Sequence, residues 1–133
     1  MKDLAFIPIG FIRTEVAEVP RHWSISRVEG EIVLQPEYQP GLTGLQAGDK
    51  IVIIFYFHKS PLFSSENLIQ KPPHRDQPAG VFSLCSPLRP NPIGLSVVEI
   101  IAIEKNIVKI KGLDMLNGTP VLDIKPYISY QAR

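Results

Sequence analysis

The chain has 133 residues, a length that suits one domain and suffices for a hydrophobic core without disulfides or metal ions. Hydrophobic residues make up 44% of the chain and charged residues 20%, which excludes an intrinsically disordered protein. The net charge of +1 gives no overall field that would attract a polyanion, so a nucleic-acid surface would need local clusters of basic residues. We predict one domain over residues 1–133.

The N-terminal segment and the cysteine content bear on the cellular compartment. The apolar run near the start is interrupted by Pro8 and Gly10, and no small-residue cleavage site follows, so we predict no signal peptide. No apolar stretch is long enough for a transmembrane helix. Cys85 is the single cysteine, which rules out an internal disulfide and a cysteine-based zinc site. We expect a soluble cytoplasmic protein that binds no metal and no membrane.

Runs of β-branched, aliphatic and aromatic residues predict the secondary structure. In chain order they predict strands at residues 4–14, 25–34, 51–58, 80–86, 95–103, 107–116 and 119–128. Residues 51–58 are apolar up to their last position, which is typical of a strand buried on both faces. The chain shows no long amphipathic helix and no internal repeat. We therefore predict an all-β fold, a single-sheeted β-barrel of about seven strands with long loops.

The longest predicted loops are rich in proline and glycine. Residues 35–50 are predicted to be a loop with room for one helical turn, and residues 59–79 form a second long loop. Within the second loop, Ser64 or Ser65 could cap a short helix. Loops of this length inside a compact domain are usually functional or disordered, so residues 59–79 are a candidate functional segment.

The segment SPLRPNPIGLS, residues 86–96, which we call the proline loop, holds three prolines between two predicted strands. Each proline fixes its own φ, removes a backbone donor and keeps the preceding residue extended. Arg89 and Asn91 therefore point to the same side, and Gly94 permits a close approach of a ligand. The loop is either a stiff corner that Arg89 and Asn91 fix by hydrogen bonds, or a rigid surface that presents both side chains to RNA.

Three groups of motifs carry a family resemblance. They are IPIGFIRT and PRH in the N-terminal part (residues 7–14 and 20–22), GVFSLCSPLRPNPIGLS (residues 80–96) and GLDMLNGTPVLDIKPYI (residues 112–128). In these motifs, and over nearly its whole length, the chain resembles the TsaA-like family. Characterised members of that family include the TrmO-type tRNA adenine N6-methyltransferases. The chain is similar to the short, single-domain form.

This resemblance implies a β-barrel with S-adenosyl-L-methionine as methyl donor, a homodimer with the cofactor near the subunit interface, and tRNA as partner. The methyl group would go to the exocyclic amine of the threonylcarbamoyl-modified adenosine next to the anticodon. The family's cofactor contacts fall on the matching positions Pro20, Arg21, His22, His58, Lys59, Cys85, Leu95, Asn117, Gly118, Thr119 and Pro120. Two positions depart from the family pattern, because Cys85 stands where arginine is usual and Asn117 where aspartate is usual.

A methyl transfer to an amine requires alignment of the reactants and a group that accepts a proton. We expect Asp123 or His58 to be this catalytic group, although Asp123 could instead form a structural ion pair with Lys125. Trp23 and Tyr38 could stack on a base, but we expect Trp23 to pack in the core instead and Cys85 to be a small buried filler. The side chains that could contact RNA are Arg89 and Asn91 and the basic residues Arg21, His22, His58, Lys59, Lys71, His74 and Arg75.

Two alternative functions stay open. The departures at Cys85 and Asn117 favour a module that still binds S-adenosyl-L-methionine or RNA but is catalytically impaired, because arginine and cysteine share neither charge nor donors. The modest net charge favours a methyltransferase that acts on another acceptor, such as a different modified adenosine or a small molecule. Cofactor binding and methyl transfer to tRNA separate these hypotheses.

Overall fold

The computed structural model describes residues 2–128. Over those residues the protein is mostly β-structure, which confirms the predicted all-β class. The strands are β1 (Gly10–Arg13), β2 (Glu29–Leu34), β3 (Lys50–Tyr56), β4 (Ile69–Gln70), β5 (Ala79–Gly80), β6 (Ile93–Glu104), β7 (Ile107–Lys111) and β8 (Pro120–Pro126). Short 3-10 helices connect them, namely η1 (Trp23–Ile25), η2 (Pro36–Leu42), η3 (Ser65–Leu68) and η4 (Val81–Ser83).

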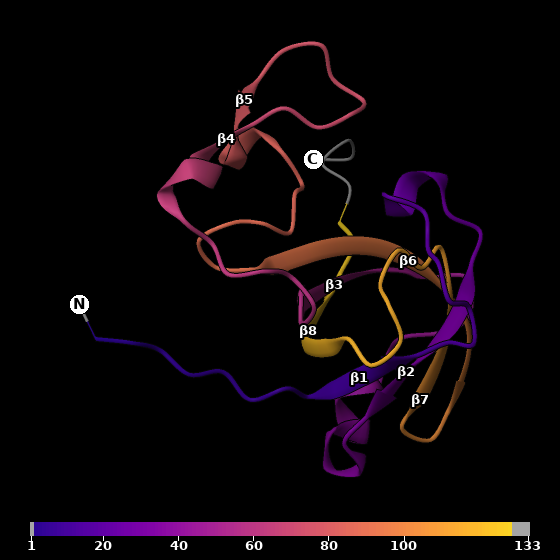
Figure 1. Cartoon of the computed structure of the whole chain (residues 1–133). Helices are drawn as coiled ribbons and strands as arrows, with labels where there is room; N and C mark the ends of the chain where they lie inside the picture. Colours follow the sequence, from indigo (N-terminus) through magenta and orange to yellow (C-terminus); the bar gives the residue numbers. More distant parts are fainter. Residues whose placement is uncertain (1, 129–133) are drawn as a thin grey trace.

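The main sheet is antiparallel throughout and closes on itself (Figure 1). Its strands follow one another in the order β1-β2-β7-β6-β3-β8, the order of a closed barrel. The ring is completed where β1 pairs with β8, through Gly10 opposite Val121 and Phe11 opposite Pro120. Register shifts in the β3–β8 and β6–β7 pairs mark irregularities of the bulge type, which bend strands as closure requires.

Aliphatic side chains that alternate along the strands fill the barrel. In β3, Ile51, Ile53 and Phe55 are buried, whereas the residues between them are only half-buried. The expectation that this strand is buried on both faces is therefore wrong for its outer face. Burying each such side chain stabilises the fold by roughly 1.5–3 kcal/mol. The other strands contribute Ile12, Ile32, Leu34, Val98, Ile100, Val108, Ile110 and Val121 to the same core.

Several strand boundaries differ from the predicted ones for local reasons. The first strand starts only at Gly10, and residues 2–8 before it are exposed and unpaired. The strand predicted at 107–116 ends at Lys111, because Gly112 adopts a φ of +103° and turns the chain. The strand predicted at 80–86 is wrong for most of its length, since only Gly80 at its start is paired and η4 follows directly.

The long loop at 59–79 has its own secondary structure and lies beside the barrel rather than within it (Figure 1). β4 and β5 form a separate two-stranded sheet, with Ile69 opposite Gly80 and Gln70 opposite Ala79. Ser64 stands at the start of η3, as expected. The backbone N–H of Ser64 donates a hydrogen bond to Oδ1 of Asn67 at 3.0 Å. These local bonds make residues 59–80 an ordered flap.

The predicted helical turn at 35–50 is present as η2. Among residues 2–128, no helix has the length and apolar character that a membrane crossing demands.

Candidate functional site

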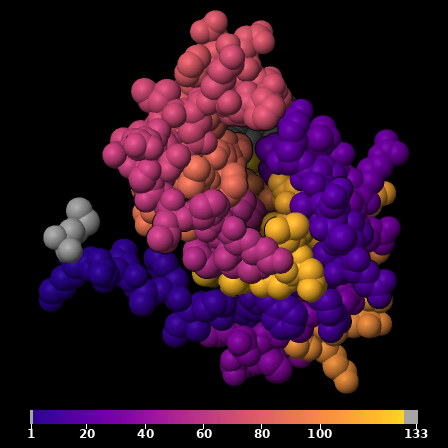
Figure 2. Space-filling view, in the orientation of Figure 1, coloured from indigo at the N-terminus to yellow at the C-terminus, as the bar shows by residue number. Residues whose placement is uncertain are grey.

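One end of the barrel carries a cavity of about 830 Å³ (Figure 2). It lies between the flap and proline loop, drawn in pink and orange, and the purple and yellow segments on the other side. Four stretches far apart in the sequence line it: residues 19–23, 55–61, 84–95 and 114–119. Its volume falls within the roughly 300–1,000 Å³ that is typical of small-molecule sites.

Aromatic and aliphatic side chains line much of the cavity. Phe55 and Phe57 meet edge to face with ring centroids 5.0 Å apart, and Ile93 and Leu95 lie on the neighbouring strand β6. The residue between Ile93 and Leu95 must be glycine, because a Cβ atom at position 94 would clash with Cζ of Phe55. The absence of a side chain at Gly94 thus lets the Phe55 ring occupy this wall.

Arg89 both lines the cavity and fixes the proline loop. Its Nη1 donates to the carbonyl oxygens of Leu84 at 3.0 Å and Ser86 at 3.2 Å. These bonds compensate for the donors that the prolines lack, and they bear out the stiff-corner interpretation of Arg89. Asn91 is exposed and does not line the cavity.

The flap holds the other carbonyls of the proline loop. Nε2 of Gln70 donates to the carbonyl oxygen of Leu88 at 2.7 Å, and Oγ of Ser60 donates to that of Pro87 at 3.1 Å. The flap and the proline loop therefore form one wall of the cavity.

The opposite wall contains the PRH segment and η1. Nδ1 of His22 accepts a hydrogen bond from the backbone N–H of Ser24 at 3.2 Å and so caps η1. The rings of His22 and Trp23 lie 4.9 Å apart. Trp23 is half-buried and lines the cavity, so the expectation that it packs in the core is wrong. The reason is that η1 lies over the barrel end and has no buried residue.

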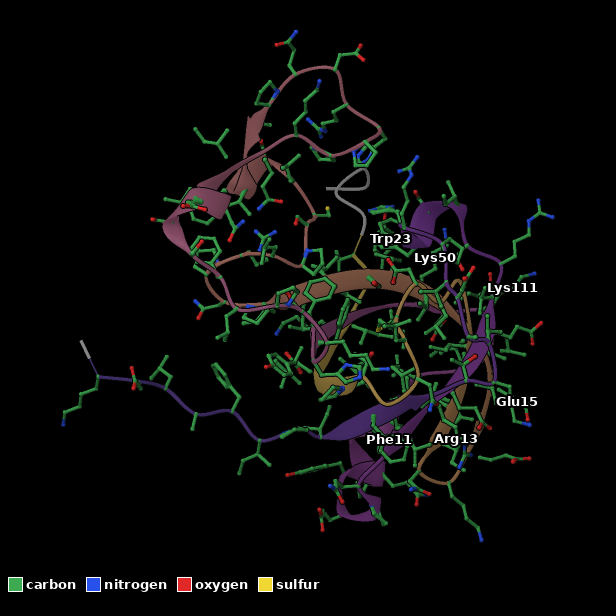
Figure 3. The ribbon with its side chains drawn as sticks, in the orientation of Figure 1. Phe11, Arg13, Glu15, Trp23, Lys50 and Lys111 are labelled. Carbon is green, nitrogen blue, oxygen red and sulfur yellow. The ribbon has the colours of Figure 1, made fainter. Side chains whose placement is uncertain are left out.

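Trp23 also lines a second, smaller hollow of about 230 Å³. Lys50 and Lys111 contribute to the same hollow, and all three are labelled in Figure 3. Trp23 therefore contributes to the main cavity and to this smaller hollow.

Asp114 is the functional candidate that sequence reasoning missed. Its carboxylate lines the cavity and accepts a hydrogen bond from Oγ of the fully buried Ser96 at 2.5 Å. Burial raises the pKa of Asp114, whereas hydrogen bonds from Ser96 and from the backbone of Trp23 and the charge of His22 act in the opposite direction. An acidic residue between the apolar residues of GLDML was the available signal.

His58 follows β3 and lies half-buried in the cavity wall. Burial, and then the positive charge of the adjacent Lys59, lower the pKa of His58 below the ordinary histidine value of 6.5. The imidazole is therefore neutral over more of the physiological pH range and can accept a proton.

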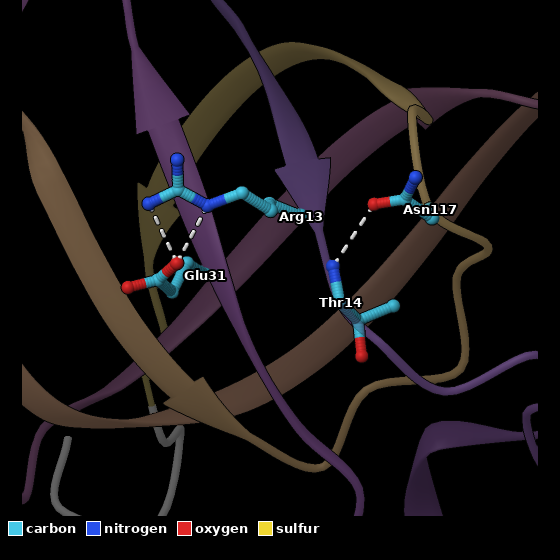
Figure 4. Close-up of polar contacts among 4 residues, drawn as sticks. All are labelled: Arg13, Thr14, Glu31 and Asn117. Atoms are coloured by element: carbon cyan, nitrogen blue, oxygen red, sulfur yellow. Dashed lines mark hydrogen bonds and ion pairs between the residues drawn. The ribbon is translucent and has the colours of Figure 1, made fainter.

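The NGTP turn stands where β8 begins, next to His58. The N–H of Thr119 donates to the carbonyl oxygen of Leu116 at 3.1 Å, and Gly118 adopts a φ of +84°, as an Asn-Gly turn favours. Oδ1 of Asn117 accepts a hydrogen bond from the backbone N–H of Thr14 at 3.0 Å (Figure 4). Asn117 thus ties the end of β1 to this turn.

The structure brings most of the predicted site residues together. Those that line the cavity are Pro20, Arg21, His22, His58, Lys59, Cys85, Arg89, Leu95 and Thr119. Cys85 is exposed there, so the expectation of a buried filler is wrong.

The remaining predicted site residues lie outside the lining. Asn117, Gly118 and Pro120 belong to the adjacent turn, although a Cβ atom on Gly118 would lie 3.9 Å from Nε2 of His58. Asp123 forms an ion pair with Nζ of Lys125 at 2.9 Å, as the structural alternative predicted. The basic residues Lys71, His74 and Arg75 are exposed on the flap and do not line the cavity.

The fold and the cavity define a protein with a closed antiparallel sheet and an amphipathic cavity at one end. The sequence model of the tRNA-methyltransferase O N-terminal domain family matches residues 12–132. Because the match covers most of the chain, the protein belongs to this family, and the predicted TsaA-like membership is confirmed.

Similar proteins agree with this assignment. An S-adenosyl-L-methionine-binding protein of Archaeoglobus fulgidus is 38% identical over 123 residues, which are 90% of this chain and 86% of that protein. The human tRNA (adenine(37)-N6)-methyltransferase is 41% identical over 103 residues, 77% of this chain but 23% of that enzyme. The crystal structure of TrmO from Pseudomonas aeruginosa superimposes with a TM-score of 0.77 at 32% identity. The match covers 100% of this chain and 58% of that one, so the chain spans little more than half of the TrmO structure.

Replacing Arg89 with alanine should loosen the proline loop. Loss of the two hydrogen bonds from Nη1 is expected to cost about 1–2 kcal/mol of unfolding free energy. The same substitution should speed hydrogen exchange at the backbone amides of Ser86 and Leu88, measured by mass spectrometry. Arg75→Ala, on the exposed flap, is the matched control and should leave both unchanged. Unaltered exchange in Arg89→Ala would contradict the loop-fixing role.

Proposed function

We propose that this protein is an S-adenosyl-L-methionine-dependent methyltransferase that acts on tRNA in the cytoplasm. The proposed acceptor is the exocyclic amine of adenosine 37 carrying a threonylcarbamoyl group, by analogy with the human relative named tRNA (adenine(37)-N6)-methyltransferase. The observation that carries the proposal is that the PRH, proline-loop and LDMLNGT segments converge on one amphipathic cavity.

The side chains present fit the proposed cofactor. Phe57 and Trp23 offer aromatic faces for an adenine ring, and Asp114 offers a negative charge for a cationic ligand. This combination of an apolar body and a few charged groups is typical of cofactor pockets. When bound, the cofactor supplies a methyl group carried on a positively charged sulfur.

His58 is the group we propose for proton acceptance. Its lowered pKa keeps the imidazole neutral, and its position in the cavity wall places it beside the NGTP turn. The other sequence candidate, Asp123, is engaged with Lys125 outside the cavity lining. His58 therefore suits the removal of a proton from an amine better than Asp123 does.

The flap supports the proposal of an RNA partner. Arg21 and Lys59 are exposed at the cavity, and Lys71, His74 and Arg75 are exposed on the adjoining flap. Cations in this arrangement can bind phosphates on either side of a base that enters the cavity. Anticodon-loop bases are accessible without opening a duplex, which lowers the cost of presenting one to the pocket.

The N-terminal segment supports the proposal of a homodimer. Leu4, Phe6 and Ile7 are 83%, 68% and 78% exposed, and their segment extends away from the barrel (Figure 1). Clustered exposed apolar side chains are typical of interaction surfaces. We propose that a second copy of this chain covers them.

Methyl transfer tests the proposed function directly. The purified protein is incubated with S-adenosyl-L-methionine and tRNA that carries threonylcarbamoyl-adenosine, and the digested nucleosides are analysed by mass spectrometry. We expect one added methyl group on that nucleoside, and none when the tRNA lacks the threonylcarbamoyl group. Transfer only to other acceptors would instead support a methyltransferase that acts on a different modified adenosine or on a small molecule. Cofactor binding without any transfer would support the impaired binding module, for which the exposed Cys85 is the structural argument.

Activity should depend on pH through His58. Because its pKa is lowered, the neutral ring predominates near pH 7 and is lost only when the pH falls through a value below 6.5. We expect kcat/KM to decline along that acidic limb, and His58→Gln to reduce kcat about a hundredfold and abolish the limb. Glu66→Gln, an exposed flap residue with no proposed contact to RNA, is the control and should retain both. An acidic limb that persists in His58→Gln would contradict the role.

The dimer is tested by light scattering in solution. The double variant Phe6→Ser, Ile7→Ser should shift the protein from dimer toward monomer, because it removes apolar surface from the proposed contact. Leu62→Ser removes a side chain that is 97% exposed in the flap and should leave the mass unchanged. A wild-type protein that is monomeric at every concentration would refute the homodimer.

A further inference from the structure

Charge is distributed unevenly around the cavity. Among the described residues that line it, Asp114 is the acidic one, and it is half-buried against the fully buried Ser96. The cations Arg21 and Lys59 are exposed, whereas Arg89 is half-buried and its Nη1 is bonded to the carbonyl oxygens of Leu84 and Ser86. The cavity therefore has one half-buried carboxylate, at Asp114, and two exposed cations at its opening.

The charge of Asp114 is not cancelled by an ion pair. Over residues 2–128, its hydrogen-bond donors are the Ser96 hydroxyl, the backbone of Trp23 and its own backbone, and no lysine or arginine lies within salt-bridge distance. His22 is the nearby titratable group. Burial raises the pKa of Asp114, and a cation beside the carboxylate would stabilise its charge.

We propose that Asp114 makes the cavity prefer the positively charged methyl donor over its uncharged thioether product. The inference rests on the proposed function, because it takes S-adenosyl-L-methionine as the ligand. The donor and its product, S-adenosyl-L-homocysteine, differ by one methyl group and by the positive charge on sulfur. A carboxylate in a half-buried site interacts with that charge more strongly than it would in water.

This preference favours the exchange of product for donor. Loss of the methyl group removes the charge that Asp114 stabilises, so the product is held less tightly than the donor. At the opening, the exposed Arg21 and Lys59 attract a polyanionic acceptor without opposing the donor inside. Asp114 is thus a specificity residue, and the proton-accepting role proposed for His58 is separate from it.

Calorimetric titration tests the inference. The wild-type protein and Asp114→Asn are each titrated with the two ligands at mildly alkaline pH, where the carboxylate is ionised. The amide keeps the oxygen that accepts the Ser96 hydrogen bond, so the local fold should survive. We expect the affinity for S-adenosyl-L-methionine to fall by roughly tenfold while that for S-adenosyl-L-homocysteine changes by less than about twofold. Asp114→Glu keeps the charge and should keep the preference.

Asp76→Asn, which neutralises an exposed carboxylate on the flap, is the matched control and should leave both affinities unchanged. Equal weakening of both ligands in Asp114→Asn would show a purely structural role and overturn the inference while the proposed function stands. Failure of the wild-type protein to bind either ligand would overturn both.

If Asp114→Asn does not fold, the wild-type protein still provides a test. Its preference for the charged ligand should decrease from low to high salt, because ions screen the carboxylate. A preference for S-adenosyl-L-methionine that is absent at low salt would overturn the inference.

Discussion

The site depends on the hydrogen-bonded position of β3 between β6 and β8. In this register Phe55 lies opposite Gly94 on one side and Val121 on the other. β6 and β8 are antiparallel to β3, so both strands begin beside the end of β3. His58, which follows β3, therefore lies next to the start of β6 and the turn before β8. A slip of one residue would turn Phe55 out of the core and move the cavity wall with it.

The cavity is stiff for a reason that follows from its prolines. A loop without backbone donors must have its carbonyls satisfied by other groups, and here Arg89, Gln70 and Ser60 supply them. Two loops that form no long strands therefore hold one another in place. A wall ordered in advance loses little entropy when a ligand binds, which suits a reaction that depends on alignment.

The two departures from the family pattern have different structural meanings. Oδ1 of Asn117 accepts the Thr14 hydrogen bond, and an aspartate oxygen would accept the same bond, so this exchange preserves the link between β1 and the turn. Cys85 lies exposed in the cavity, where an arginine would add a cation beside Arg89. The change at Cys85 therefore removes a charge from the cavity lining itself, whereas the change at Asn117 removes one from the exposed turn beside it.

The sequence by itself determined the all-β class, the central strands and the family, because alternating apolar residues and rigid motifs such as RPNPIG act locally. Most of the site residues that it predicted also line the cavity. Only the tertiary structure decided the places of Asp114 and Trp23, since both positions depend on how a loop packs across the barrel end. It likewise decided that Asp123 pairs with Lys125 while Asp114 lines the cavity. Sequence spacing places a side chain on a face of a strand, whereas burial and charge depend on what the other strands bring beside it.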